Sequence, residues 1–167
     1  PEIVCNSSTV TLSWTGNNTV SYRYRLEPIS YADTVTTYTD WTDWSSEANI
    51  TLEYLDEGIY NFYVLGRFNL EEVQLDSTEF NFEVNAITGP ALRMYPLKRN
   101  VQPNSNFDIY LFAEEIESVA YYSIQLKYDP EKITYSNFGL GTFVGDNDPG
   151  ETIFSFDPDI IDSENGI

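Results

Sequence analysis

The sequence of 167 residues has no histidine, a single cysteine and only 8 basic residues. Without histidine the chain cannot use a Ser-His-Asp or Cys-His mechanism, and zinc sites of the usual His/Cys type are excluded. The single cysteine, Cys5, has no partner for an internal disulfide. It is either a small hydrophobic residue of the first strand or a thiol that pairs with another chain or with sequence outside this segment.

Other catalytic signatures are missing as well. Gly139-Leu140-Gly141 is too short for a phosphate-binding loop and precedes no predicted helix. Nothing in the sequence places two of the 27 acidic residues across a cleft, as glycoside hydrolysis requires. We therefore expect that the chain is not an enzyme.

Acidic residues dominate the charge, because 27 Asp and Glu against 8 Lys and Arg give a formal net charge of −19. Such a surface repels nucleic acid and anionic lipid, so neither is an expected partner. The sequence has no secretion signal and no apolar stretch that could span a bilayer, so we expect no membrane insertion in this segment. The acidity suits a secreted or cell-surface protein or one that binds cations. Adaptation to high salt is a further interpretation, because salt screens the repulsion.

The composition favours strands. Aromatic residues make up 16% of the sequence, which is enough apolar surface for packed cores, and Thr, Tyr, Val, Ile and Phe are abundant. We expect an all-β protein of two consecutive antiparallel β-sandwiches, residues 1–86 and 87–167, with the second one incomplete. Gly89-Pro90 marks the boundary. So short a linker leaves little slack, and the two sandwiches should form a rod.

Alternating apolar residues predict the strands of the first domain, which are Thr9–Trp14, Val20–Leu26, Asn49–Tyr54, residues 55–68 and Glu79–Val84. The polar stretch Glu27–Ser46 is long for a loop and is expected to hold a short edge strand.

One element of the first domain resembles the tyrosine corner of fibronectin type III and related immunoglobulin-like domains. It is the Leu-x-x-Gly-x-Tyr pattern of Leu55, Gly58 and Tyr60. In such a corner the tyrosine hydroxyl bonds a nearby backbone group and pins a crossover between sheets. With SYRYRLE and WTDWS, the stretch YLDEGIYNFYV looks closer still to the three-tyrosine repeat domain of bacterial extracytoplasmic sensors, a relative of the fibronectin fold.

Two further patterns in this domain suggest glycans. Trp14, Trp41 and Trp44 could stack on sugars, but Trp14 falls on the inward face of its strand. Trp41 and Trp44 are three apart and should point to opposite faces of a strand, one buried and the other open to solvent. Core packing is thus the preferred interpretation and carbohydrate binding the alternative. Three Asn-x-Ser/Thr sequons begin at Asn6, Asn17 and Asn49 and would be glycosylation sites in an archaeal or eukaryotic source.

The second domain is organised around Tyr121–Val144. A strand, Tyr122–Tyr128, is stopped by Asp129-Pro130, and a short strand, Lys132–Tyr135, and a glycine turn follow. This order, with its lead-in VQPNSNFDIYLFAEEIESVA, resembles the first half of a cohesin domain. The resemblance covers roughly Gly89 to Ile167. Cohesins are jelly-roll sandwiches found outside cells, and the best studied bind dockerin modules in cellulosomes.

The cohesin resemblance implies dockerin as a partner, but the positions that commonly carry Asn and Asp are Tyr121 and Ser123 here. This departure argues against a standard dockerin contact and is more typical of cohesin-like domains outside cellulosomes. A cohesin-like sandwich needs about nine strands, whereas the predicted ones are Leu92–Tyr95, Phe107–Phe112, Tyr122–Tyr128, Lys132–Tyr135 and Glu151–Phe156. Further sequence of the same protein should complete the fold, or else strands of a neighbouring subunit.

Two acidic loops are the candidate metal site. They carry Asp146 and Asp148 in one loop and Asp157, Asp159 and Asp162 in the other. Calcium takes six to eight oxygen ligands, which Asp and Asn loops supply. Neither loop matches the EF-hand pattern, so solvated acidic turns are the competing interpretation.

Together these patterns predict a non-catalytic structural or adhesive module of a larger secreted or cell-surface protein. Its partners would be other protein modules or subunits. Two alternatives are a cohesin-type scaffoldin module that binds dockerin and an accessory region of a secreted polysaccharide-degrading enzyme. The ends, Pro1-Glu2 and Asn165-Gly166-Ile167, do not look natural, which indicates a piece of a longer protein.

Overall fold

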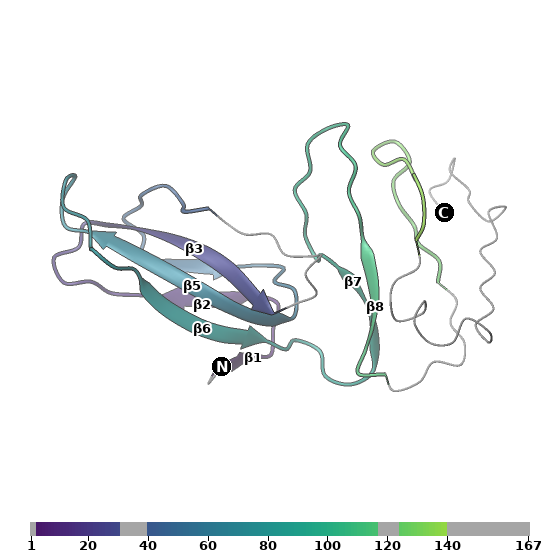
Figure 1. Cartoon of the computed structure of the whole chain (residues 1–167), viewed down its shortest axis with the longest axis horizontal. Helices are drawn as coiled ribbons and strands as arrows, with labels where there is room; N and C mark the ends of the chain where they lie inside the picture. Colours follow the sequence, from purple (N-terminus) through teal and green to yellow (C-terminus); the bar gives the residue numbers. More distant parts are fainter. Residues whose placement is uncertain (1–2, 31–39, 117–123, 140–167) are drawn as a thin grey trace. The chain divides into compact units, whose positions relative to one another are not determined.

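The computed structural model of the chain describes residues 3–30, 40–116 and 124–139 (Figure 1). The chain divides into two compact units, Pro1–Glu115 and Ile116–Ile167. The described residues are all-β, with no helix and eight strands, all of them in the first unit: β1 (Val4–Cys5), β2 (Val10–Ser13), β3 (Ser21–Ser30), β4 (Asn49–Leu52), β5 (Gly58–Arg67), β6 (Thr78–Val84), β7 (Ala91–Tyr95) and β8 (Tyr110–Glu114).

The strands up to β6 form two sheets. One has four strands in the order β1-β6-β5-β3, in which β1 runs parallel to β6 and the other neighbours are antiparallel. The other is the antiparallel pair β2-β4. Strands β2 to β6 overlap the five strands that the alternation predicts, because period-two apolar residues form strands when one face is buried, but β1 was not predicted and β3 extends beyond Leu26 to Ser30.

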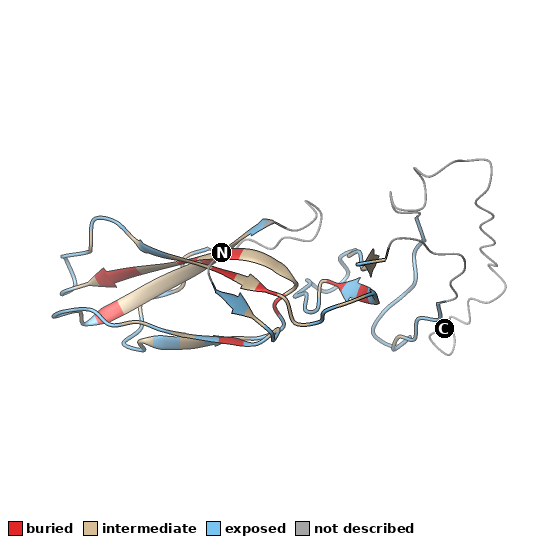
Figure 2. Ribbon diagram, turned by 90° about the horizontal axis from the view of Figure 1, so that it is seen from below, coloured by how far each residue is buried: buried red, intermediate tan, exposed pale blue. Residues whose placement is uncertain are grey.

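One hydrophobic core joins the two sheets. Val10 of β2, Leu26 of β3 and Phe82 of β6 belong to the same buried cluster, against which Leu12, Ile50 and Leu52 also pack. Figure 2 shows the buried positions along these strands in red. Burial of each large apolar side chain contributes about 1.5–3 kcal/mol.

Part of the segment between β3 and β4 forms backbone hydrogen bonds with β3, the last strand of the four-stranded sheet. Tyr22 and Ser45 exchange two backbone hydrogen bonds of 2.7 and 2.8 Å, and the Thr42 amide donates to the Tyr24 carbonyl at 2.9 Å. Of the stretch Glu27–Ser46, predicted to be a loop with a short edge strand, Glu27–Ser30 continue β3, and in residues 40–46 the pairing is only an isolated bridge at Ser45.

Strands β7 and β8 pair as an antiparallel ribbon from Ala91↔Glu114 to Tyr95↔Tyr110. The predicted strand Leu92–Tyr95 lies within β7. The predicted strand Phe107–Phe112 is wrong at its start, because β8 begins only at Tyr110. Pro96 follows directly after β7 and has no amide hydrogen, so the ladder ends where that residue begins.

Two predicted strands of the second domain are wrong in the described residues, because residues 124–139 contain no strand. The carbonyl of Asp129 accepts the amide hydrogens of Lys132 and Ile133 at 3.1 and 2.9 Å. The start of the predicted strand Lys132–Tyr135 therefore bonds into a turn instead of a ladder. Of the predicted strand Tyr122–Tyr128, residues 124–128 are described, and they pair with none of the described strands. Tyr121–Ser123 and the predicted strand Glu151–Phe156 lie outside the described residues.

Candidate functional site

The three residues of the predicted tyrosine corner lie together at the start of β5. Leu55 is buried, and its amide donates to the Ser8 carbonyl at 2.9 Å. Gly58 has φ 141°, a conformation that side-chain-bearing residues rarely adopt. The hydroxyl of Tyr60 donates to the carbonyl of Asp56 at 2.6 Å, and its ring stacks on Phe82 with centroids 5.5 Å apart. Tyr60 thus fixes the turn that precedes its own strand.

The environment keeps the Tyr60 hydroxyl protonated. Burial is the largest effect, and the negative charge of Asp56 and the neighbouring Tyr95 add to it, so the pKa of Tyr60 is raised well above its ordinary value. The hydroxyl therefore remains a hydrogen-bond donor to the Asp56 carbonyl over the whole physiological range.

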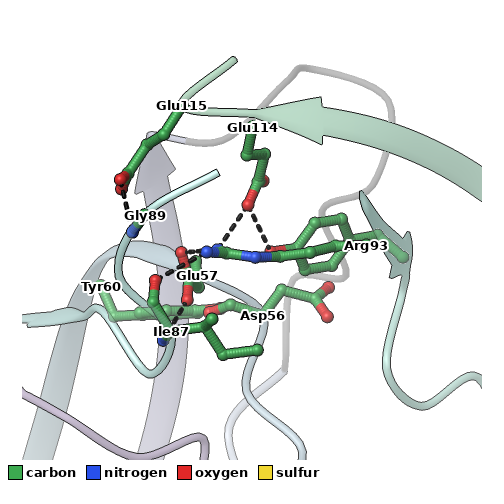
Figure 3. A network of polar contacts seen from close by, with 9 residues as sticks. Asp56, Glu57, Tyr60, Ile87, Gly89, Arg93, Glu114 and Glu115 are labelled. Carbon is green, nitrogen blue, oxygen red and sulfur yellow. Dashed lines mark hydrogen bonds and ion pairs between the residues drawn. The ribbon is translucent and has the colours of Figure 1, made fainter. Parts of the chain in front are cut away.

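A buried arginine on β7 connects the ribbon to the same turn (Figure 3). Arg93 is only 8% exposed, and its guanidinium forms ion pairs with both Glu57 and Glu114. Its second nitrogen donates to the carbonyl of Ile87 at 2.6 Å. A buried charge is tolerated only when it is paired and hydrogen-bonded, and the two terminal nitrogens of Arg93 together meet both conditions. We call Asp56, Glu57, Ile87, Arg93 and Glu114 the joint.

The two carboxylates next to Tyr60 also hold the chain on either side of β7. Glu57 accepts the amide hydrogen of Ile87, four residues before β7, at 2.8 Å. Asp56 accepts the amide hydrogen of Leu97, two residues after β7, at 2.8 Å. Beside the joint, Glu115 accepts the amide hydrogen of Gly89 at 2.6 Å. The stretch around Gly89-Pro90 is therefore tied at several points.

The sequence pattern singled out Leu55, Gly58 and Tyr60, but it did not reveal the joint. A signal was present, because period two in β7 places Arg93 on the same face as Tyr95, while Leu92 and Met94 occupy the exposed face. An arginine on the buried face of a strand requires a carboxylate partner. Nothing local in the sequence, however, indicates that this partner is Glu57.

Burial raises the pKa of Asp56 above its ordinary value, because desolvation disfavours the charged carboxylate. The hydrogen bond from the Leu97 amide offsets only part of this rise. The folded protein therefore holds this proton more tightly than the unfolded chain does. The contribution of Asp56 to stability is fully present below its unfolded pKa of about 3.9 and is lost as the pH rises through the raised folded value.

We therefore expect Asp56→Asn to stabilise the protein at neutral pH, because the amide keeps an oxygen for the Leu97 bond without a buried charge. The advantage should disappear as the pH falls toward about 4. Urea unfolding of the variant and the parent across this pH range measures it. Asp76→Asn, at an exposed position, controls for the change in net charge. A difference between variant and parent that is independent of pH would contradict the assignment.

Trp41 and Trp44 pack against arginines instead of facing opposite sides. Arg23 lies over both indole rings at 5.0 Å from each centroid, and Arg67 lies over Trp44 at 4.7 Å. Both tryptophans are half-buried. The prediction of opposite faces is wrong because residues 41–44 are not a strand, so period two does not apply. Trp14 packs on Phe62 at 5.6 Å, next to the core, as expected.

The remaining predicted site residues are placed as follows. Asn6, Asn17 and Asn49 have exposed side chains. Cys5 is half-buried, is a free thiol and packs against the core cluster. The candidate calcium ligands all lie outside the described residues: Asp146, Asp148, Asp157, Asp159 and Asp162. Among the described residues no group of three or more metal-ligating side chains occurs, and no helix is long and apolar enough to cross a membrane.

Comparison of the chain with models of protein families, with curated proteins and with solved structures gives no match.

Proposed function

We propose that the chain is a non-catalytic structural module of a larger extracellular protein, in which a fibronectin III- or immunoglobulin-like sandwich is joined rigidly to the start of a cohesin-like domain. The partners of such a module are other protein modules at the cell surface. The joint carries this proposal, because it makes the connection between β6 and β7 a buried, hydrogen-bonded one.

The strand arrangement supports the first half of the proposal. Immunoglobulin-like domains pack a sheet of strands C, F and G against one that contains B and E. Here β3, β5 and β6 occupy neighbouring positions in one sheet, and β2 and β4 form the other. The bond from the Tyr60 hydroxyl to the Asp56 carbonyl adds the tyrosine corner that is characteristic of these domains.

The composition of the joint supports the second half. A spacer between modules transmits orientation only if its connection resists bending, and interfaces between domains move by default unless they are well fixed. The connection here buries Arg93 and uses the carboxylates of Glu57, Glu114 and Asp56 on backbone and guanidinium donors. These contacts support a single orientation of β7 relative to the turn before Tyr60.

Backbone ¹⁵N relaxation of the full chain tests the proposal. We expect the amides of β5, β6, β7 and β8 to share one rotational correlation time. Glu57→Ala should shorten the value for β7 and β8 only, because Arg93 and the Ile87 amide lose an acceptor. Glu53→Ala, an exposed glutamate just before the corner, is the matched control and should change nothing. Faster tumbling of β7 and β8 in the parent protein would overturn the proposal.

A further inference from the structure

A pocket of about 310 Å³ lies beside the core, at the edge where β3 meets the segment that leads into β4. This volume is at the lower end of the range of small-molecule sites. Its lining residues are Trp14, Tyr22, Tyr24, Thr42, Asp43, Ser45, Glu47, Asn49 and Ile50. None of the joint residues is among them, so the pocket is a separate feature.

Three aromatic rings line the pocket at an angle to one another. The centroids of Trp14 and Tyr22 are 6.0 Å apart with planes inclined by 71°, and those of Trp14 and Tyr24 are 6.0 Å apart with planes inclined by 52°. Rings in this arrangement form a corner and not the flat platform on which a sugar ring stacks. Aromatic rings attract an organic cation that lies over their faces, and three such rings line this pocket.

The charge of the lining is negative. Asp43 and Glu47 carry carboxylates, and the lining includes no Lys or Arg. Period two on β3 explains this distribution, since Arg23 and Arg25 alternate with Tyr22 and Tyr24 and lie over Trp41 instead. The net charge of −19 adds an attractive field for cations.

We propose that this pocket binds an organic cation, an ammonium or guanidinium group that lies against the aromatic lining of Trp14, Tyr22 and Tyr24 and pairs with Asp43 and Glu47. The cation can come from a free small molecule such as choline or from a Lys or Arg side chain of a protein partner. Both sources present the same chemistry to the site, namely a positive charge with an apolar or planar surface for the rings.

Titration of the full chain with choline, and separately with Nα-acetyl-arginine amide and Nα-acetyl-lysine amide, tests the proposal. We expect shifts of the Tyr22 and Tyr24 amide signals and of the Trp14 indole signal in NMR spectra. The neutral choline isostere 3,3-dimethylbutan-1-ol should leave them unchanged. Binding of choline alone identifies a small-molecule source, and binding of the amino acid amides alone identifies a protein side chain.

Two double variants separate the site from the overall charge. Asp43→Asn with Glu47→Gln is expected to weaken binding about tenfold, because the cation loses both of its carboxylate partners. Glu71→Gln with Glu79→Gln removes the same charge at exposed positions that do not line the pocket and should leave the affinity within about twofold. Tyr22→Leu should weaken binding about threefold to fivefold through the lost ring face.

Three results would each overturn the proposal. The first is the absence of shifts with all three cations. The second is equal weakening by the two double variants, which would mean that only net charge matters. The third is binding of the isostere, or of cellobiose in place of the cations, because either would show that the rings recognise apolar surface or sugar.

Discussion

Replacement of Tyr60 by alanine is expected to lower the free energy of unfolding by about 3–5 kcal/mol, because a buried aromatic side chain is lost and a cavity remains. Tyr60 is 7% exposed and stacks on Phe82, which is itself fully buried. Tyr60→Phe keeps the ring and removes only the hydrogen bond to the Asp56 carbonyl, so it should cost about 0.5–1.5 kcal/mol.

Urea unfolding followed by tryptophan fluorescence measures both effects, since all three tryptophans lie between residues 14 and 44. Tyr54→Ala is the control, because Tyr54 lies in the same turn but is 55% exposed. Its effect should stay below about 1 kcal/mol. If Tyr60→Ala and Tyr60→Phe both unfold like the parent, Tyr60 is not a corner residue.

Replacement of Arg93 by methionine is expected to lower the free energy of opening of the joint by about 3–5 kcal/mol, because two carboxylates are left in a buried site without their cation. The side chains of Glu57 and Glu114 are 16% and 15% exposed, so water compensates only in part. Methionine retains most of the apolar stem of arginine, so lost charge rather than lost volume dominates the effect.

Native-state hydrogen exchange of the β7 amides is the appropriate readout, since it distinguishes local opening of β7 from unfolding of the whole protein. Arg99→Met is the matched control, because Arg99 lies in the exposed stretch after β7. We expect protection of β7 to fall in Arg93→Met and to persist in Arg99→Met. Unchanged protection in Arg93→Met would mean that the ion pairs do not hold the ribbon.

Local patterns were sufficient to predict most of the strands up to β6. Alternation identified β5 and β6, because residues such as Phe62 and Phe82 lie on one face of their strands and face one core. The Leu-x-x-Gly-x-Tyr spacing identified the turn because Gly58 adopts a φ that favours glycine. In both cases the information lies within a few residues of the position it determines.

Most of the errors and omissions involve contacts that the local sequence pattern does not show. Arg93 and Glu57 are 36 residues apart, and the pattern of β7 shows which face is buried without showing what covers it. Period two failed for Trp41 and Trp44 because no strand forms there, and arginines from two strands determine where the indoles lie. The predicted strand at Lys132 failed because Asp129 accepts its amide hydrogen in a turn.

A double-mutant cycle on Glu57 and Arg93 tests the joint most directly. Glu57→Gln, Arg93→Met and the double variant are compared with the parent by hydrogen exchange of β7. A control cycle uses Arg25 and Glu27, an ion pair of 3.8 Å whose side chains are 39% and 36% exposed. We predict a coupling free energy of about 1–3 kcal/mol for Glu57 and Arg93, against less than about 0.5 kcal/mol for the control pair. A coupling for Glu57 and Arg93 no larger than that of the control pair would contradict the account.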